Sequence, residues 1–265
     1  MRNTSMTSSA FSRLAASYDT EFSGTVLGRY YRARVHARCE KYWPGGKHIV
    51  EINAGTGEDA LFLASLGNRV LATDIAQPMV DKIAEKANKL GLTDSIDCKP
   101  LAIEQLCDLH GQQFDGLLSN FGGLNCIADF ESFVDSANKL LRPGSYMILV
   151  LMGRWVPWEW GYFGCRGQFS KAIRRVEGRT LWREMEIYYP RLSTVKRQLG
   201  KHFELMHSEG LGIVMPPSYV NDVVKRHPRL FAKLAVLEEK LANWSPLAHI
   251  ADHYLLIYQR RPHHD

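Results

Sequence analysis

The sequence has no apolar run long enough to cross a bilayer. The longest such run, YMILVLM, covers Tyr146–Met152, whereas a membrane-spanning helix needs about 20 apolar residues. The first 19 residues hold no continuous hydrophobic segment, so we expect no secretory signal and no membrane span. Internal repeats and low-complexity tracts are also absent. The 265 residues therefore predict one large globular domain, 1–265.

Cysteine pairs are scarce as well. The five cysteines are odd in number, and no two of them have CxxC spacing. This pattern argues against a disulfide framework and against a zinc site. We therefore expect reduced cysteines, a cytoplasmic location and no bound metal.

No strong charge of one sign dominates the chain, whose formal net charge is +5. Residues 1–150 carry 15 Lys and Arg against 17 Asp and Glu, and residues 151–265 carry 18 against 11. The basic second half suits an anionic substrate or a nucleic acid. Because its basic and acidic residues are interleaved, an ordinary solvated surface is the simpler interpretation, and nucleic acid is not the expected partner.

Alternating strand and helix patterns fill the first 150 residues. Apolar strand patterns occupy 47–53, 69–74, 95–100, 114–120 and 145–152, and amphipathic helix patterns occupy 57–67, 77–91 and 128–141. Nearly continuous apolar strands that alternate with helices indicate a parallel sheet covered on both faces. We therefore predict an α/β fold.

The regular alternation of strand and helix patterns ends after residue 152. Further strand patterns occur at 179–189, 203–215 and 252–261, with helix patterns at 193–203, 217–227 and 228–244. A sixth strand parallel to the others and an antiparallel last strand would complete a seven-stranded, mostly parallel sheet. We expect residues 1–46 to form amino-terminal lid helices over a core of 47–152, and the helical insertions 153–192 and 216–251 to form lids over a substrate.

A short glycine loop joins the first strand to the first helix of the core. Gly55 and Gly57 let the backbone pass close to a ligand and begin a helix tightly. Glu51 lies inside the strand end, where a carboxylate is costly unless it serves a ligand or the loop. Asp74 ends the next strand, 17 residues beyond Gly57, in position to bind two ribose hydroxyls. These features predict a nucleoside site.

Two nucleoside ligands fit this pattern. GTGEDA matches the GxGxxA signature of nicotinamide dinucleotide sites. However, Glu58 and Asp59 occupy the first turn of the following helix, where they would repel a pyrophosphate. A sulfonium nucleoside with a free ammonium and no phosphate tolerates this acidity. The charge pattern therefore favours S-adenosylmethionine over a dinucleotide.

Five segments in order resemble the motifs of the class I S-adenosylmethionine-dependent methyltransferases. They are VEINAGTG (50–57), ATDIAQPMV (72–80), PLAIEQL (100–106), FDGLLSNFGGLN (114–125) and ANKLLRPGSYMIL (137–149). The resemblance covers roughly residues 10–152 and is nearest to the small-molecule branch that includes ubiquinone and menaquinone biosynthesis enzymes. That branch has a Tyr-Asp pair that matches Tyr18 and Asp19. One position departs from the family, because Asn53 stands where a glycine is usual; asparagine tolerates a positive φ better than most residues.

The resemblance implies a Rossmann-like methyltransferase fold and S-adenosylmethionine as the cofactor. In it Glu51 would order the loop and meet the methionine ammonium of the donor, Asp74 would hold the ribose diol, and Tyr18 would close the site. The implied donor-binding residues are Tyr18, Glu51, Asn53, Ala54, Gly55, Gly57, Asp74, Ile75, Met79, Ala102, Ile103, Ser119, Asn120 and Phe121.

The sequence is less specific about the acceptor. Aromatic residues crowd 155–163, which suits a small planar or lipophilic molecule methylated at O, N or S. His253, at the start of the last strand, is the candidate catalytic base. An RNA methyltransferase and a non-catalytic binding protein of the same fold remain alternatives. The sequence does not indicate an oligomeric state.

Overall fold

One large sheet organises the protein. The computed structural model describes residues 2–15, 18–183 and 185–262, so residues 1, 16–17, 184 and 263–265 of the expected lids and tail lie outside it. The strands of the large sheet are β1 (His48–Ile52), β2 (Arg69–Asp74), β3 (Ile96–Pro100), β4 (Phe114–Ser119), β5 (Leu141–Met152), β8 (Phe203–Leu211) and β9 (His253–Arg260). Their spatial order is β3-β2-β1-β4-β5-β9-β8.

The directions of the strands confirm the predicted sheet. Strands β1 to β5 pair in parallel, and β9 runs antiparallel to both β5 and β8, so β8 is parallel to the first five. The chain order reverses between β1 and β4. In open α/β sheets the ligand lies outside the carboxyl ends of the strands at such a reversal. The glycine loop after β1 is therefore at the expected binding position.

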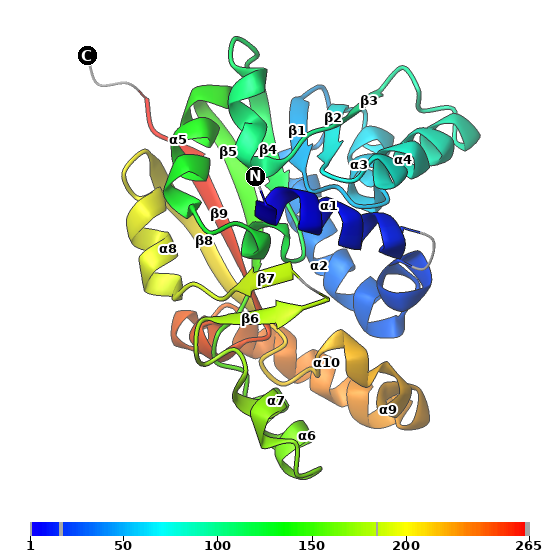
Figure 1. Cartoon of the computed structure of the whole chain (residues 1–265), viewed down its shortest axis with the longest axis vertical. Helices are drawn as coiled ribbons and strands as arrows, with labels where there is room; N and C mark the ends of the chain where they lie inside the picture. The colour runs from blue at the N-terminus through cyan, green and yellow to red at the C-terminus, as the bar shows by residue number, and fades with distance from the viewer. Residues whose placement is uncertain (1, 16–17, 184, 263–265) are drawn as a thin grey trace.

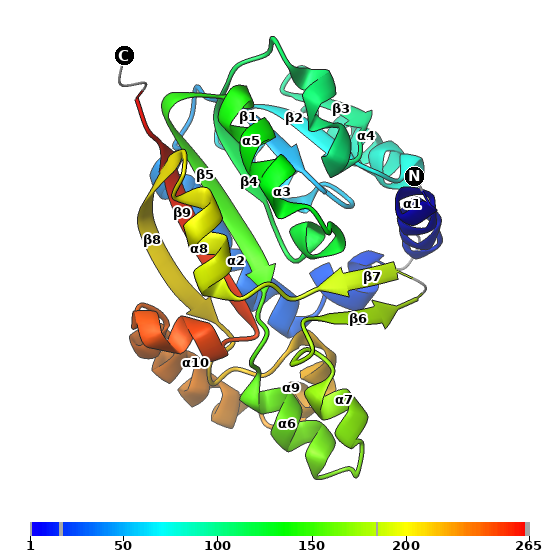
Figure 2. The ribbon, with the colours of Figure 1, turned by 60° about the vertical axis from the view of Figure 1, so that its left-hand side comes forward.

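Helices cover both faces of this sheet (Figures 1 and 2). The α-helices are α1 (Arg2–Leu14), α2 (Val26–Tyr42), α3 (Glu58–Ser65), α4 (Gln77–Lys89), α5 (Phe130–Leu140), α6 (Pro157–Gly164), α7 (Phe169–Ile173), α8 (Leu192–Leu199), α9 (Asn221–Arg226) and α10 (Pro228–Ala242). Short 3-10 and π segments are η1 (Asp19–Ser23), η2 (Ile103–Leu109), η3 (Gly123–Cys126), η4 (Ser218–Val220) and η5 (Ser245–Ile250). Helices α5 and α8 pack on one face, and α2 and α3 pack on the other.

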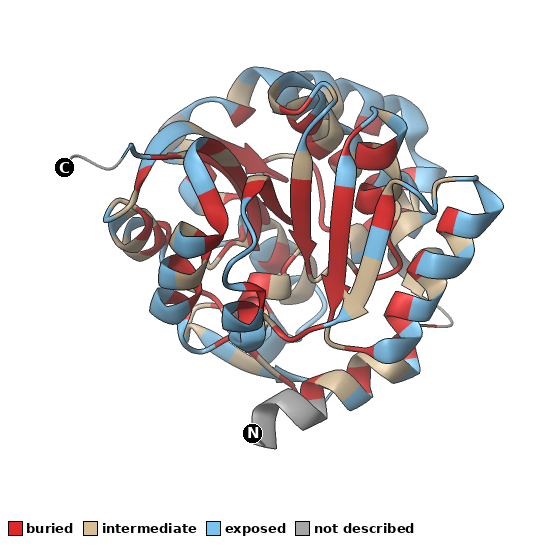
Figure 3. Cartoon of the chain, turned by 90° about the horizontal axis from the view of Figure 1, so that it is seen from above, coloured by how far each residue is buried: buried red, intermediate tan, exposed pale blue. Residues whose placement is uncertain are grey.

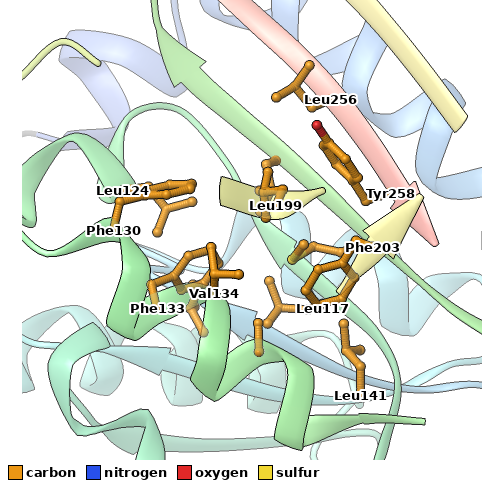
Figure 4. Close-up of a cluster of buried hydrophobic side chains, with 14 of the residues drawn as sticks. Leu117, Leu124, Phe130, Phe133, Val134, Leu141, Leu199, Phe203, Leu256 and Tyr258 are labelled. Atoms are coloured by element: carbon orange, nitrogen blue, oxygen red, sulfur yellow. The ribbon is translucent and has the colours of Figure 1, made fainter. Parts of the chain in front are cut away.

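The core consists of the strands and the inward sides of these helices. Figure 3 shows buried residues concentrated on the central strands, with exposed residues on the outer helices. Figure 4 shows one face, where Phe133 and Val134 of α5 pack with Leu199 of α8 against Leu117 of β4. On the opposite face, Tyr31 and the neighbouring apolar residues of α2 pack against the same strands. Burial on both faces explains why the strands read as apolar runs.

The segment at 179–189 corrects one sequence expectation. It is not one strand but the hairpin β6 (Arg179–Trp182) and β7 (Met185–Tyr188), whose strands pair with each other and not with the large sheet. The other expected elements are present with boundaries shifted by a few residues; for example, β5 begins at Leu141 and β8 ends at Leu211.

The two insertions meet at one end of the molecule. In Figure 1 both α6–α7 and α9–α10 lie at the lower end, beyond the arrowhead of β5 in Figure 2. The Tyr162 and Phe163 rings of α6 contact Tyr219 of η4, with centroids 5.8 and 5.5 Å apart. The insertions therefore share a small aromatic cluster on the side of the carboxyl ends of the strands. Within the described residues, no helix is both long and apolar enough to traverse a bilayer.

Candidate active site

The glycine loop between β1 and α3 adopts a conformation that requires glycine. Gly55 and Gly57 have φ values of 56° and 84°. A Cβ on Gly57 would lie 2.9 Å from Cγ1 of Ile83, which packs under the loop from α4. Both the positive φ and the close approach exclude a larger residue at this position. The loop thus begins α3 while leaving its backbone accessible.

Asp74 ties this loop to the end of β2. Its Oδ2 accepts a hydrogen bond from the Gly55 amide, and its Oδ1 accepts one from the Ala76 amide, both at 2.9 Å. The residue is only 6% exposed. Burial raises the pKa of Asp74 to about 6, although the Ala76 and Gly55 amides oppose the shift. A carboxylate oxygen has two lone pairs, so each oxygen keeps capacity to accept a further bond from a ligand hydroxyl.

Glu51 is a buried acid at the end of β1. It is 1% exposed, and its Oε2 has no hydrogen-bond partner among the described residues. Burial, reinforced by the negative charge of Asp59, raises the pKa of Glu51 well above its usual range, with Arg32 opposing the shift. A buried carboxyl with an unpartnered oxygen is costly, and a cationic ligand group at this point would compensate it.

Asp59, one of the two acids in the first turn of α3, is compensated by basic and amide side chains of the protein. Asp59 forms an ion pair with Arg32 at 2.8 Å, and His36 Nε2 lies within hydrogen-bond distance of its other oxygen at 2.7 Å. Asn120 donates a further hydrogen bond to it at 2.9 Å. Burial alone would raise the pKa of Asp59, but Arg32, His36 and Asn120 outweigh it and lower that pKa to about 2.

Glu58, the other acid of that turn, pairs with Lys86 at 2.6 Å. The expected repulsion of a pyrophosphate by these two acids is therefore weaker than the sequence suggests, since each has a cationic partner. Among the described residues, Glu51 and Asp74 are the acids of the site that have no cationic partner.

Asn53 fixes the loop to the neighbouring strand. Its φ of 51° agrees with the expected tolerance of asparagine for this conformation. The Asn53 amide donates to the Asn120 carbonyl at 3.0 Å, and the Ser119 hydroxyl donates to Asn53 Oδ1 at 2.7 Å. A Cβ on Gly123 would lie 2.0 Å from Cγ of Asn53, so the glycine makes room for this side chain. The β1 loop and the end of β4 therefore form one hydrogen-bonded unit.

The amino-terminal segment closes over this unit. The half-buried Tyr18 ring lies 3.5 Å from the position that a Cβ of Gly55 would take, and burial raises the pKa of Tyr18 to about 12. Asp19 accepts a hydrogen bond from Thr56 and pairs with Lys86 at 2.8 Å. The cavity that remains at the loop has a volume of about 10 Å³, enough for a single water molecule. This cavity is too small for a nucleoside, so we expect the segment to move when one binds.

The remaining predicted donor-binding residues fall into two groups. Ile75 and Met79 pack with Tyr18 in a small apolar cluster at the end of β2. Ala102 is buried at the start of η2, whereas Ile103 packs toward the core under α5 and not into the Tyr18 cluster. Ala54 donates its amide to the Thr73 carbonyl at 2.8 Å. These residues follow the carboxyl ends of β1, β2 and β3, with Ile103 packed against the core on the α5 side.

Phe121 connects the loop region to His253. The Arg32 guanidinium lies 5.5 Å from the centroid of the Phe121 ring, and the His253 ring meets it edge-on at 5.7 Å. His253 Nδ1 is 3.0 Å from Oδ2 of Asp252. The opposite oxygen of Asp252 pairs with Arg175 at 2.9 Å. Among the described residues Nδ1 has no hydrogen-bond partner, so the Asp252 carboxylate lies beside the imidazole without fixing its orientation.

Sequence reasoning missed the cationic partners of these acids. Arg32 and His36 are four residues apart on α2, so they share one side of that helix and reach Asp59 together. That spacing was a usable signal. By contrast, nothing local predicts that Arg175 pairs with both Asp252 and the buried Glu159. Within the described part of the chain, no group of three or more His, Cys, Asp or Glu is arranged to hold a metal ion.

Fold and site together define a class of protein. The strand order with its antiparallel β9, the glycine loop after β1 and the acid at the end of β2 are the features of the predicted methyltransferase family. Residues 50–149 also match the family model described as a methyltransferase domain. The fold and this match support a class I S-adenosylmethionine-dependent methyltransferase, in agreement with the predicted family, fold and donor.

Two curated methyltransferases align with part of this chain. A ubiquinone biosynthesis O-methyltransferase of Methylocella silvestris is 32% identical over 132 residues, which cover 49% of this chain and 50% of that protein. A tRNA 5-carboxymethoxyuridine methyltransferase of Escherichia coli K12 is 22% identical over 144 residues, 53% of this chain and 55% of that one. The chain therefore aligns with about half the length of these curated relatives.

A solved structure shows the likeness of fold over a longer stretch. The S-adenosylmethionine-dependent methyltransferase of Methanosarcina mazei superimposes with a TM-score of 0.60 at 18% identity, covering 85% of this chain and 98% of that one. Identity this low supports the fold and carries no information about the acceptor.

Proposed function

We propose that this protein transfers the methyl group of S-adenosylmethionine to an O, N or S atom of a small aromatic or lipophilic molecule. The observation that carries the proposal is the buried Glu51, whose Oε2 has no partner among the described residues, beside a glycine loop held by Asp74. The donor has the complementary groups, since it carries an ammonium, a ribose diol and no phosphate.

Each donor group has a proposed partner. The donor, when bound, supplies an electrophilic methyl on a sulfonium. Glu51 would pair with its ammonium, and Asp74 would accept hydrogen bonds from the ribose diol. The backbone at 53–57, together with Ser119, Asn120 and Phe121, would line the methionine chain. Ile75, Met79, Ala102 and Ile103 would flank the adenine, and Tyr18 would close over the bound nucleoside.

His253 is the proposed base for the acceptor. Asp252 lies on its Nδ1 side, and Phe121 places the ring next to the residues proposed to line the transferring methyl. Arg175 in turn holds Asp252. A hydroxyl or amine acceptor would lose its proton to His253 Nε2 as the methyl is transferred. The partly exposed Trp155 and Trp160, with ring centroids 6.2 Å apart, offer an apolar wall for such an acceptor.

RNA is the second candidate acceptor, because one relative is a tRNA methyltransferase and residues 151–265 are basic. Ion pairs with buried acids remove several arginines from the basic surface and so argue against RNA. Arg174 and Arg175 pair with the buried Glu159, and the basic residues of α2 at Arg34 and Arg38 pair with Glu209. Since these cations are neutralised internally, we favour the small molecule. Its place of action would be the cytoplasm, consistent with five free cysteines.

Donor binding is the first test. We expect S-adenosylmethionine and S-adenosylhomocysteine to raise the thermal unfolding temperature and to give a calorimetric binding isotherm, whereas NAD gives neither. Asp74→Ala should lower the affinity by about a hundredfold, because two charge-assisted hydrogen bonds of about 1.5 kcal/mol each are lost. Asp81→Ala, on the exposed side of α4, is the matched control and should leave the affinity unchanged.

The outcomes separate the alternatives. Binding of NAD without binding of S-adenosylhomocysteine would refute the proposal. Donor binding followed by transfer of radiolabel to tRNA, and to no small molecule in a panel of phenols, amines and thiols, would replace the favoured acceptor with RNA. His253→Asn should reduce transfer while S-adenosylhomocysteine binds as before. Absence of any donor binding would favour a non-catalytic protein of the same fold.

A further inference from the structure

A second cavity lies on the opposite side of β9 from His253. Its volume is about 90 Å³, which is much larger than the space left at the glycine loop. Four parts of the chain line it: the segment after β5, the β7–α8 connection with the first turn of α8, η5 and β9. Figure 2 shows the chain passing from β7 into α8 close to the end of β5. The lining residues are Arg154, Trp155, Pro190, Arg191, Leu192, Ser193, His249 and Tyr254.

The charge of this lining is entirely of one sign. Arg154 and Arg191 contribute guanidinium groups, and no acidic residue lines the cavity. Within the described residues neither arginine forms an ion pair, in contrast to Arg174 and Arg175, whose charges are matched by Glu159. Arg154 is held in place by the Val176 carbonyl, which accepts from its Nε at 2.9 Å and its Nη2 at 2.6 Å. A positioned cation without a carboxylate partner favours an anion.

The first turn of α8 adds to the positive potential. Arg191 precedes this helix as its N-cap, no side chain caps the helix, and its first turn has no acid. The amides of Leu192 and Ser193 come first in the helix, so they have no carbonyl partner within it. Both residues line the cavity. The positive end of the helix dipole therefore acts on the same space as the two arginines.

Tyr254 provides an independent indication of a ligand. It is 1% exposed, lines the cavity, and its hydroxyl has no hydrogen-bond partner among the described residues. Buried hydroxyls in folded proteins nearly always have a partner, so one without a partner at a cavity wall calls for an acceptor from outside the chain. A carboxylate or phosphate oxygen would accept from it. Trp155, Pro190 and Leu192 form the apolar part of the wall.

We propose that this cavity binds the oxyanion group, carboxylate or phosphate, of a small organic molecule. Arg154 and Arg191 would neutralise the charge, the first amides of α8 and the Tyr254 hydroxyl would donate to the oxygens, and Trp155 would pack against the apolar remainder. Tyr254 follows His253 in β9, and successive strand residues point to opposite faces, so the cavity lies across the strand from the proposed base. The oxyanion site does not rest on the proposed function.

Calorimetry with benzoate and with inorganic phosphate tests the proposal. We expect at least one of them to bind the wild-type protein, with an affinity that falls as salt rises. Arg191→Ala should weaken binding about tenfold, since a charge-assisted contact is lost, and Tyr254→Phe should weaken it about threefold. Arg166→Ala is the control, and binding should stay unchanged, because Arg166 lies beyond the end of α6, is exposed, and contacts Tyr162 instead of lining the cavity.

The two probes identify the group that the cavity takes. Binding of benzoate alone indicates an aromatic carboxylate, and binding of phosphate alone indicates a phosphate ester; either result supports the site. Failure of both probes to bind, or binding that Arg191→Ala and Tyr254→Phe leave unchanged, overturns it. Retained thermal unfolding temperatures show that the variants fold. S-adenosylhomocysteine binding is measured in parallel, so failure of the donor assignment is recognised separately from failure of the oxyanion site.

Discussion

The raised pKa of Asp74 makes donor binding depend on pH. The ribose hydroxyls donate hydrogen bonds, so they require the ionised carboxylate, while burial holds the pKa of this group at about 6 in the free protein. At pH 7 about nine tenths of Asp74 is ionised, and at pH 5 about one tenth. We therefore expect the affinity for S-adenosylhomocysteine to fall about tenfold from pH 7 to pH 5, because binding must first remove the proton.

The pH dependence that Asp74 gives to the stability of the free protein has the opposite sign to that of donor binding. Because the folded pKa of Asp74 lies above its usual value of 3.8, the group stabilises the folded state below about pH 4, and that contribution is lost as pH rises through about 6. The bound donor, whose hydroxyls satisfy the carboxylate, offsets this loss. Donor-induced thermal stabilisation should accordingly be larger at pH 7 than at pH 5.

Isothermal titration calorimetry between pH 5 and pH 7.5 measures the predicted slope. Glu51 also has a raised pKa and would add its own pH dependence, so the series is carried out in the Glu51→Gln background. In that background Asp74→Asn should bind weakly and with no pH dependence, since the amide does not titrate in this range. An affinity that is flat with pH when Asp74 is present, or a slope that survives in Asp74→Asn, would refute the assignment of the diol to Asp74.

Two further predictions concern the framework of the site. Gly57→Ala should destabilise the protein by about 2 kcal/mol or more and weaken donor binding, because the new Cβ meets Ile83. The control is Gly67→Ala, which has nearly the same φ but nothing within 4 Å of the new Cβ. In urea unfolding it should cost only about 1 kcal/mol. Equal losses of unfolding free energy in these two variants would show that the strain of the positive φ, and not the contact with Ile83, determines the destabilisation. Glu238→Ala should lower the free energy of unfolding by about 3–5 kcal/mol, since four backbone amides of residues 212–215 donate to this buried carboxylate. The control is Glu239→Ala, at an exposed position. Equal unfolding midpoints for the two variants would contradict this prediction.

The parallel sheet could be predicted because its signal is local and repeated. Each strand is an apolar run that ends in a polar or glycine-rich turn, and β1, β2 and β4 end where the first, second and fourth motifs place them. The hairpin β6–β7 was missed because its turn lacks the usual residues. Arg183 adopts a φ of 48° there, a conformation more typical of glycine or asparagine. Residues 179–189 therefore read as one continuous strand.

The acids of the candidate site were visible in the sequence, but their electrostatic state was not. Glu58 and Asp59 looked alike as first-turn acids, yet each has a different cationic partner from a distant helix. Glu51 differs from both because Arg32 is directed to Asp59. Which acid remains uncompensated depends on contacts between α2, α3 and α4, and these follow from tertiary packing and not from local pattern.

The contact of Asp19 with Thr56 and Lys86 has a pharmacological consequence. Since Tyr18 covers the Gly55 loop, the apparent affinity for any nucleoside equals the intrinsic affinity multiplied by the fraction of molecules in which this segment is displaced. A compound that binds only the covered arrangement would lower that fraction without competing for the adenine, ribose or methionine contacts. Inhibitors of this protein therefore need not resemble a nucleoside.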